Sequence, residues 1–271
     1  MKVLLNNTDY KETIEFVPTH NVEYHTKVTF HCFWHGILTE KHMFSILSCF
    51  YFNRTHKIIL WVENTTKNNY YNEIEKYAEI KPFVLKDELK NTFMENGTFY
   101  YNKSLSYYSD LVRYTLLYKY GGCWFDLDCF FLRSFDPLFY YYENEICVYQ
   151  WESQLYPNGA IFISLEPLST IMKKNIEFII NRNLGWGFQE AQLTYDTPID
   201  MLVLPCSWFD PDWLHNPYPI KGNIFNETNK SYDFENFFKG SFCYHWHNKW
   251  NHPVHPSSII KQLVTIIQNN L

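Results

Sequence analysis

Two aspartates separated by one residue, Asp126 and Asp128, are the residues of this chain best suited to chemistry. They lie in a run from Cys123 to Leu132 whose aromatic and apolar residues predict a strand. Because side chains alternate along a strand, Trp124, Asp126 and Asp128 are expected on one face. Paired carboxylates repel each other unless a proton or a cation neutralises them, and a hard divalent ion such as Mg²⁺ or Mn²⁺ suits oxygen ligands.

A divalent ion held in this way keeps room for the phosphate oxygens of a substrate. It can act as a Lewis acid when a nucleoside diphosphate leaves the anomeric carbon of a sugar. The bare motif is also compatible with two solvated aspartates at a strand end, and with a haloacid-dehalogenase-type phosphatase in which the first aspartate is the nucleophile. The phosphatase pattern needs a long apolar strand before the motif, and residues 118–122 do not provide one. A calcium-binding EF-hand loop is excluded, because its turn glycine and closing glutamate are missing.

The residues before the motif predict a helix that ends at Gly121. Ser109 is the expected N-cap, Asp110 is expected in the first turn, and Lys119 in the last turn. Gly121 suits the left-handed conformation that ends a helix. Asp110 and Arg113 fall on one face of this helix, where spacing alone predicts either a surface ion pair or part of a site.

Strands and helices alternate ahead of this segment, which predicts an α/β domain with a parallel sheet. In such a domain the ligand binds beyond the carboxyl ends of the strands. The expected strands are 27–34, 57–62 and 82–85, and the expected helices are 42–53 and 71–78.

Composition excludes several classes of protein. With 271 residues, 46% of them hydrophobic and 19% charged, the chain can form a large core. A net charge of −6 gives no basic surface for nucleic acid. No apolar run approaches the ~20 residues of a transmembrane segment, and polar residues interrupt the N-terminal run before it can serve as a signal peptide.

Seven scattered cysteines without a CxxC pair indicate reduced thiols, neither a disulfide framework nor a thiolate zinc site. We therefore expect a cytoplasmic protein, in a bacterial or viral setting. Four histidines between His245 and His255 suggest zinc at first sight, but Pro253 and Pro256 break any helix that would gather them.

The string SDLVRYTLLYKYGGCWFDLD, residues 109–128, resembles the donor-site signature of glycosyltransferase family 32. This family of DxD sugar transferases includes fungal initiating α-1,6-mannosyltransferases and the lactosylceramide α-1,4-galactosyltransferase, with distant kinship to the glucosylating clostridial toxins. Segments 30–36, 203–211 and 245–249 resemble the family's opening strand, late strand-to-loop segment and closing His-x-x-Asn-Lys element. The resemblance covers about residues 27 to 250.

The resemblance implies a GT-A type nucleotide-diphospho-sugar transferase fold, with a mixed, mostly parallel sheet flanked by helices. It implies one domain over residues 1–271, with a donor-binding core at about 27–135, and an acceptor side and closing element at about 136–255. Apolar spacing predicts a final amphipathic helix at about 257–269, which packs on its own domain or touches a membrane surface.

The resemblance also implies roles for individual residues. Catalytic roles fall to Asp110, Arg113, Asp126 and Asp128. Nucleotide-sugar contacts fall to Trp34 and Trp124 beside the base, Asp110 and Arg113 at the ribose and hexose, Asp126, Asn158, His245, and Lys249, with Asn248 as an alternative at the diphosphate. The metal, Mn²⁺ or Mg²⁺, falls to Asp128, with Asp126 and His245 as further ligands. For Asn158, a turn between two strands is the alternative interpretation.

The function expected from this resemblance is transfer of a hexose from a UDP- or GDP-linked donor to a glycan or another hydroxyl acceptor, with retention of anomeric configuration. Retention fits front-face displacement with the departing phosphate oxygen as base, or double displacement through Glu190 or Asp196. A binding module of the same fold without turnover is the alternative outside enzymes.

Overall fold

The computed structural model describes residues 2–3, 22–96, 105–151, 157–181, 200–213 and 223–271. The strands are β1 (Lys2–Val3), β2 (Thr29–His35), β3 (Lys57–Glu63), β4 (Glu79–Pro82), β5 (Gly122–Phe125), β6 (Cys129–Phe131), β7 (Cys147–Gln150), β8 (Asn158–Ser164), β9 (Leu202–Pro205) and β10 (Cys243–His245). The helices are α2 (Glu40–Phe52), α3 (Asn69–Ile74), α4 (Leu85–Leu89), α5 (Leu105–Tyr120), α6 (Asp136–Tyr141), α7 (Thr170–Asn181) and α9 (Ile259–Asn269), with short 3-10 turns η1 (Cys206–Trp208) and η2 (Pro211–Trp213).

Eight strands form one mixed sheet in the order β1-β9-β7-β8-β5-β2-β3-β4. All neighbouring pairs run parallel except the two that involve β8, which is antiparallel to both β5 and β7. A separate two-stranded sheet pairs β6 with β10. The mixed, mostly parallel α/β fold expected from the sequence is therefore confirmed.

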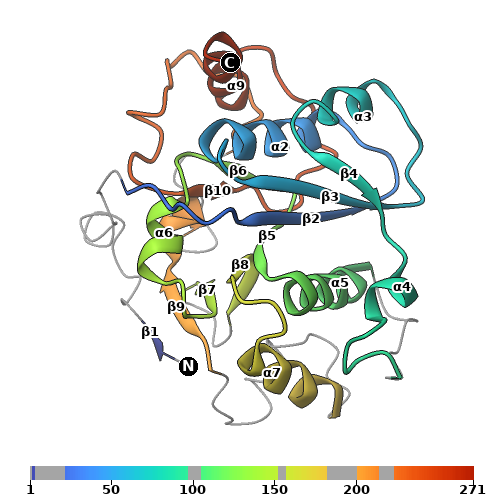
Figure 1. Ribbon diagram of the computed structural model, residues 1–271. Coiled ribbons are helices and arrows are strands. Elements are labelled where there is room, and N and C mark those ends of the chain that lie inside the picture. Colours follow the sequence, from blue (N-terminus) through green and yellow to red (C-terminus); the bar gives the residue numbers. More distant parts are fainter. Residues whose placement is uncertain (1, 4–21, 97–104, 152–156, 182–199, 214–222) are drawn as a thin grey trace.

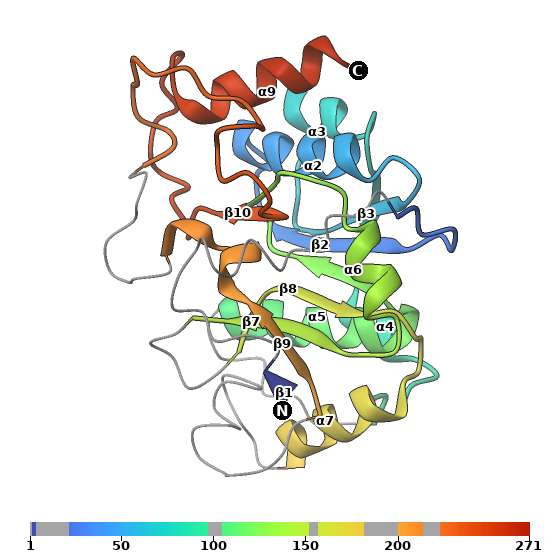
Figure 2. The same ribbon diagram turned by 90° about the vertical axis from the view of Figure 1, so that its left-hand side faces the viewer.

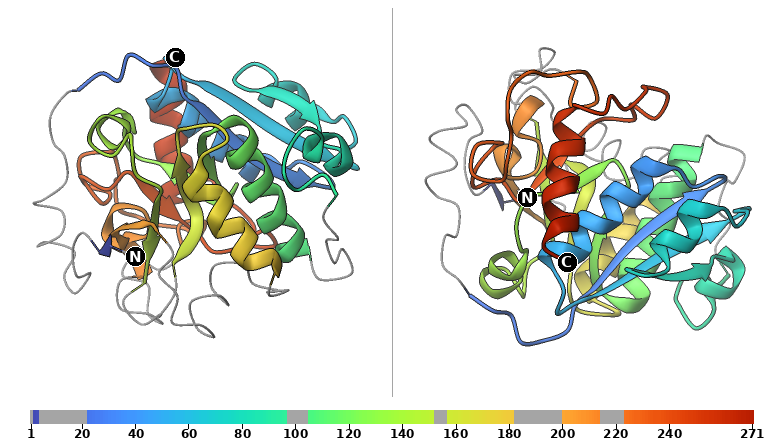
Figure 3. Two further views of the ribbon diagram at one scale, coloured as in Figure 1. Left: turned by 60° about the horizontal axis from the view of Figure 1, so that its bottom comes forward. Right: turned by 90° about the horizontal axis from the view of Figure 1, so that it is seen from above.

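Helices cover both faces of the sheet. In Figures 1 and 2, α2, α3 and α9 lie on one side of β2 and β3, and α4, α5 and α7 lie on the other side. Figure 3 shows α5 beside α7 in the left view and α9 beside α2 in the right view, and both pairs are in contact. The carboxyl ends of β2 and β5 meet at the edge of the sheet that carries the site.

The strands are buried on both faces, and their residues alternate between two cores. Phe30 and Leu60 belong to the core on the α2 side, whereas Phe33 and Trp61 belong to the core on the α5 side. This explains why 29–35 and 57–63 read as continuous apolar runs, as is usual for strands of a parallel sheet.

Helix α5 ends as expected but begins earlier than expected. It already includes Leu105, so Ser109 and Asp110 lie inside it, and the predicted N-cap at Ser109 is wrong. Its end is fixed by Gly121 and Gly122, which both have positive φ, +65° and +113°. A Cβ on either would collide with a backbone carbonyl, of Leu165 or of Thr29. The two glycines thus let the chain turn from α5 directly into β5.

The expected strand from 123 to 132 is interrupted at the DxD motif. β5 ends at Phe125, a turn covers residues 126–128, and β6 begins at Cys129. The turn is closed by a 3.0 Å hydrogen bond from the Cys129 N–H to the Asp126 carbonyl. Asp126 and Asp128 therefore occupy a turn, and the two-residue alternation of a strand does not govern their directions.

Other boundaries shift by a few residues. The expected strand 82–85 is β4 at Glu79–Pro82, since Leu85 already begins α4, and the expected helix 71–78 is the shorter α3. The C-terminal helix is present as α9, and its apolar residues Ile259, Ile260, Leu263, Val264 and Ile267 are all buried. Glu190 and Asp196 lie outside the described residues.

All seven cysteines are buried free thiols, in agreement with the sequence. Among the described residues, no helix combines the length and the apolar character needed to cross a bilayer.

His31 is a buried neutral histidine in the middle of the sheet. Its Nδ1 accepts a 3.1 Å hydrogen bond from the Trp61 indole N–H, and its Nε2–H donates to the Gly121 carbonyl at 3.1 Å. Burial lowers the pKa of His31 from 6.5 to about 4. Between about pH 4 and pH 6.5, the folded protein therefore keeps this imidazole neutral, whereas the unfolded chain binds a proton.

We predict that this histidine makes the fold sensitive to acid. The contribution of the neutral imidazole to the free energy of unfolding is complete above pH 6.5 and is lost as the pH falls toward 4. The loss at pH 5 is on the order of 1–2 kcal/mol. The variant His31→Gln cannot titrate, so its free energy of unfolding should be lower at pH 7.5 but decline less between pH 6.5 and 5. Urea unfolding at both pH values measures this, and an equal decline in the two proteins would contradict the prediction.

Candidate active site

A cavity of about 500 Å³ opens at the carboxyl ends of β2 and β5. It collects residues from the end of β2, from α5, from the DxD turn, from the start of β8, and from the end of β10 with the segment after it. Its lining includes Trp34, Asp110, Arg113, Trp124, Asp126, Asp128, Asn158 and His245, which the sequence analysis singles out, together with Phe33, His35, Ser109, Leu127, Trp151, Gly159, Ala160, His247, Asn248 and Trp250.

Arg113 joins the helix to the DxD turn. Its guanidinium contacts Asp110 Oδ1 at 2.9 Å and Asp126 Oδ1 at 2.8 Å, and it lies over the Trp124 ring, 5.2 Å from the ring centroid. A Cβ on Gly159 would collide with this guanidinium, so a side chain at this position would push Arg113 away from its two carboxylates. The Asp110–Arg113 pair is therefore part of a buried network, and the simple surface ion pair is ruled out.

This network shifts the ionisation of its members. Burial raises the pKa of Asp110 to about 6, although Arg113 opposes the shift. Burial alone would lower the pKa of Arg113, but the carboxylates of Asp126 and Asp110 outweigh it and raise that pKa. Arg113 Nε has no hydrogen-bond partner among the described residues, so one buried N–H is left over inside the cavity wall.

Trp124 supports the network. Its indole N–H donates to Asp126 Oδ1 at 2.7 Å, and its side chain is almost fully buried under the guanidinium. This burial leaves no free ring face for a nucleobase, which argues against the expected role of Trp124 beside the base. Trp34 is only partly buried and lies at the cavity, next to the rings of His42 and Trp250.

Asp128 is buried and faces the C-terminal part of the chain. Its Oδ2 lies 3.1 Å from His245 Nε2 and accepts a 2.7 Å hydrogen bond from the Asn248 backbone N–H. Burial would raise the pKa of Asp128, but His245 and the Asn248 N–H lower it to about 2. Conversely, burial would lower the pKa of His245, whereas Asp128 raises it to about 9. Without a ligand, the two side chains form an ion pair.

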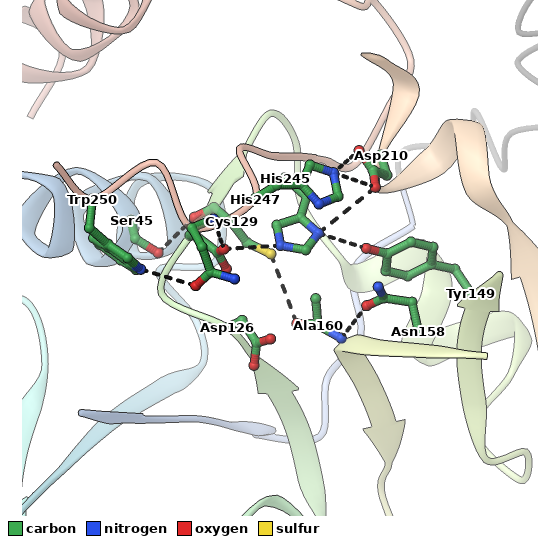
Figure 4. A network of polar contacts seen from close by, with 12 residues as sticks. Ser45, Asp126, Cys129, Tyr149, Asn158, Ala160, Asp210, His245, His247 and Trp250 are labelled. Atoms are coloured by element: carbon green, nitrogen blue, oxygen red, sulfur yellow. Dashed lines mark hydrogen bonds and ion pairs between the residues drawn. The ribbon is translucent and has the colours of Figure 1, made fainter. Parts of the chain in front are cut away.

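A second group lies behind His245 (Figure 4). The Tyr149 hydroxyl lies 2.9 Å from His245 Nδ1, and Asp210 Oδ2 lies 3.8 Å from the same nitrogen. Asp210 is fully buried, contacts His247 Nε2 at 2.9 Å and accepts a 2.6 Å hydrogen bond from the Trp151 indole. The sequence gives none of these four residues a role, because they come from β7 and the residue that follows it, from the segment after β9 and from the segment after β10, which only the folded structure brings together.

The donor set fits a divalent cation. The side-chain ligand atoms of Asp128, Cys129 and His245 lie within 4.8 Å of one another, and a carboxylate with an imidazole suits Mn²⁺ or Mg²⁺. Burial raises the pKa of the Cys129 thiol, so this sulfur stays protonated and is a poor ligand. Asp126 is not part of the group, and its Oδ1 already accepts from Arg113 and Trp124.

Asn158 and Lys249 differ in their relation to the cavity. Asn158 begins β8, so the alternative of a turn between strands is wrong, and its Oδ1 accepts from the Ala160 N–H at 2.7 Å. The Asn158 amide NH₂ is then the group left for a ligand. Lys249 is not among the residues that line the cavity, whereas its neighbours Asn248 and Trp250 are.

The architecture and the site define a class of protein. A mixed α/β sheet that breaks at a DxD turn beside a cavity is typical of nucleotide-sugar transferases of the GT-A type. Residues 39–146 match the family described as a glycosyltransferase sugar-binding region containing a DXD motif. Residues 39–146 of this chain therefore carry the DXD-motif region of a glycosyltransferase.

Solved structures agree with this fold. The glycosyltransferase GlyE of Streptococcus pneumoniae TIGR4 matches with 14% identity and a TM-score of 0.53, over 90% of this chain and 63% of that chain. The apo structure of the bifunctional glycosyltransferase WbbM matches with 10% identity and a TM-score of 0.52, over 92% of this chain and 51% of that chain. At these identities the likeness concerns the fold. No curated protein matches the sequence.

We predict that Arg113 cannot be replaced by lysine, since an ammonium cannot hold two carboxylates with the planar fork of a guanidinium. Arg113→Lys should lower the free energy of unfolding by about 2–4 kcal/mol, because Asp110 and Asp126 lose a fixed partner in a buried setting.

The matched control is Arg133→Lys. Arg133 is also partly buried and donates to the Gly240 carbonyl at 3.2 Å, away from the cavity. Arg133→Lys should lower the free energy of unfolding by less than about 1 kcal/mol. Urea titration of both variants measures the difference. Equal losses in the two variants would show that the carboxylate bridge has no special weight.

Proposed function

We propose that this glycosyltransferase transfers a hexose from a UDP- or GDP-linked donor to a hydroxyl group of a glycan or another acceptor, with a divalent metal at Asp128 and His245. The observation that carries the proposal is the convergence of Asp110, Arg113, Asp126, Asp128 and His245 on one cavity, from segments far apart in the sequence. These are the residue types needed to hold a sugar, its diphosphate and a cation together.

The carboxylates, the guanidinium and the neighbouring side chains contact different parts of the donor. Asp110 and Asp126, fixed by Arg113, face the cavity and offer acceptor oxygens to the hydroxyls of a ribose or a hexose. Trp34 offers a ring beside the nucleobase, and Asn158 offers an amide to the transferred sugar.

Asp128 and His245 would hold the metal, Mn²⁺ or Mg²⁺, and Asp126 would contact it through water. When bound, the metal supplies Lewis-acid stabilisation of the departing diphosphate. Before that, His245 must give up the proton that pairs it with Asp128, since a metal ligand is a neutral imidazole. Tyr149 accepts from the other nitrogen of the ring and so fixes its orientation.

Retention of the anomeric configuration belongs to the same proposal. Asp110 is held by Arg113, and Asp126 by both Arg113 and Trp124, which ties them down as positioning groups and makes them poor nucleophiles. This supports front-face displacement, with the departing phosphate oxygen taking the proton of the acceptor hydroxyl. Lys249 and Asn248 would approach the diphosphate from the segment after β10. Of these two residues, only Asn248 lines the cavity.

The test is calorimetric titration of the protein with UDP, GDP and their sugar conjugates, each with Mn²⁺ and with EDTA, followed by an assay for released nucleotide. We expect Mn²⁺-dependent binding of one nucleotide series, and loss of binding by at least tenfold in Asp128→Asn. Absence of nucleotide binding in the wild type would overturn the proposed donor class.

Asp136→Asn is the matched control for this substitution. Asp136 forms another Asp–His pair, 2.6 Å from His56 Nε2, but it does not line the cavity. The control should lose stability and keep its affinity for the nucleotide. If both variants lost affinity equally, the effect of Asp128→Asn would be one of folding alone.

A further prediction concerns the residue behind His245. Tyr149→Phe removes the oxygen that lies 2.9 Å from His245 Nδ1, so Mn²⁺ affinity should fall by about 10- to 100-fold. Titration of Mn²⁺ followed by electron paramagnetic resonance measures this without any donor. Unchanged affinity would show that His245 is oriented sufficiently by Asp210 or does not bind the metal.

A further inference from the structure

A buried ammonium lies next to the site and takes no part in the proposed chemistry. Lys41, in the first turn of α2, is only 3% exposed. Its Nζ donates to the carbonyls of Lys249 and Trp250, the latter at 3.2 Å, and lies 3.9 Å from the centroid of the Phe225 ring. No carboxylate of the described residues forms an ion pair with it. Burying a charge without a directly paired carboxylate is costly, so these carbonyls and this ring help to hold the ammonium, together with the more distant charge of Glu40.

The carbonyls belong to a strained turn. His247 and Asn248 have φ of +52° and +55°, two successive left-handed residues without a glycine. Left-handed backbone is unfavourable for residues with a side chain, so the conformation persists only because its surroundings fix it. The Trp250 N–H donates to the Asn248 carbonyl at 2.7 Å, and its indole donates to Asn248 Oδ1 at 3.2 Å.

The same turn forms one wall of the cavity. The Asn248 N–H donates to Asp128 Oδ2, and both Asn248 and Trp250 line the cavity. The residue after Lys41, His42, stacks on the Trp250 ring at 4.5 Å with the planes 11° apart. Helix α2 therefore contacts this wall through two consecutive residues, one polar and one aromatic.

We propose that Lys41 is a positioning residue, whose ammonium holds residues 247–250 in their strained turn and so keeps Asn248 on Asp128 and Trp250 at the cavity. The effect on the donor rests on the proposed function. The effect on the turn does not, because every contact involved is present without ligand. Lys41 does not touch the reacting atoms, and it affects the site only through the backbone of residues 247–250.

The experiment compares wild type with Lys41→Met, which keeps the apolar stem and removes the charge. Hydrogen exchange of the peptide covering 245–250, measured without nucleotide, should accelerate about tenfold, while exchange in β3 stays unchanged. With Mn²⁺ present, the nucleotide Kd and the KM for the donor should rise about tenfold, with a smaller change in kcat.

The matched control is Lys119→Met. Lys119 is a partly buried lysine of α5 that donates to the Asp87 carbonyl and to Glu88, away from the cavity. It should lose stability with no change in exchange at 245–250 or in KM. If Lys41→Met behaved like this control, with a lower melting temperature only, the proposal would be overturned.

Two further variants keep the test decisive. Asn248→Gly relieves the left-handed strain, so adding Lys41→Met to it should accelerate exchange less than in the wild-type background. If Lys41→Met does not fold, Phe225→Leu removes the ring beneath the ammonium and should shift exchange at 245–250 in the same direction by less. Equal effects of Lys41→Met in both backgrounds, or no shift in Phe225→Leu, would contradict the proposal. A wild type that binds no nucleotide refutes the donor assignment, and the exchange data still decide on Lys41.

Discussion

One carboxylate oxygen, Oδ2 of Asp128, joins the two ends of the site. It accepts the N–H of Asn248, 120 residues later, and faces the imidazole of His245. The Asp128 carbonyl accepts from the Trp246 N–H at 2.9 Å, so backbone and side chain of one residue both hold the closing segment. The pairing of β6 with β10 begins immediately beyond, with Cys129 opposite His245. The cavity exists because this junction brings the C-terminal segment back over the ends of the strands.

Part of the negative charge in the cavity is neutralised before any ligand arrives. The carboxylates of Asp110 and Asp126 share Arg113, and the carboxylate of Asp128 shares a proton-bearing imidazole. A dication held by Asp128 and His245, as proposed above, would have to displace the imidazole proton, whereas the guanidinium stays charged at any pH of interest. The site thus combines a fixed positive group with a replaceable one. This division suits a donor that carries its own negative charge and must be released after transfer.

The sequence predicts much of the fold because its signals are local. Apolar runs at 29–35 and 57–63 indicate strands buried on both faces, and the Gly121–Gly122 pair marks the end of α5. The start of α5 was mispredicted, because Ser109 has the residue type of an N-cap but lies within a helix that begins upstream. The break of the strand at the DxD motif is not predicted either, because residues 123–132 look like one continuous strand in the sequence. Cys129 to Phe131 do form a strand, but they pair with β10 in another sheet, and pairing partners are not visible in local patterns.

Of the candidate site, the residues within 109–128 and His245 could be named from the sequence, since a contiguous motif carries them. Tyr149, Asp210 and Lys41 could not, because each acts through a residue distant in sequence and has no motif of its own. For Trp124, the contacts in the structure differ from those that the sequence suggests. An aromatic residue next to the motif suggests stacking on a ligand, whereas its burial and its bond to Asp126 make it a support for that carboxylate.

The reversed direction of β8 has a practical consequence for work on this enzyme. Because β8 is antiparallel to β5, it contributes its first residues, Asn158 and Gly159, to the cavity, and its last residue, Ser164, lies at the opposite edge of the sheet. The turn that follows carries Leu168, which is 55% exposed. A fluorophore attached to the side chain at Leu168 would lie beyond the far end of β8 from the cavity, so this position offers an attachment point that leaves the cavity accessible.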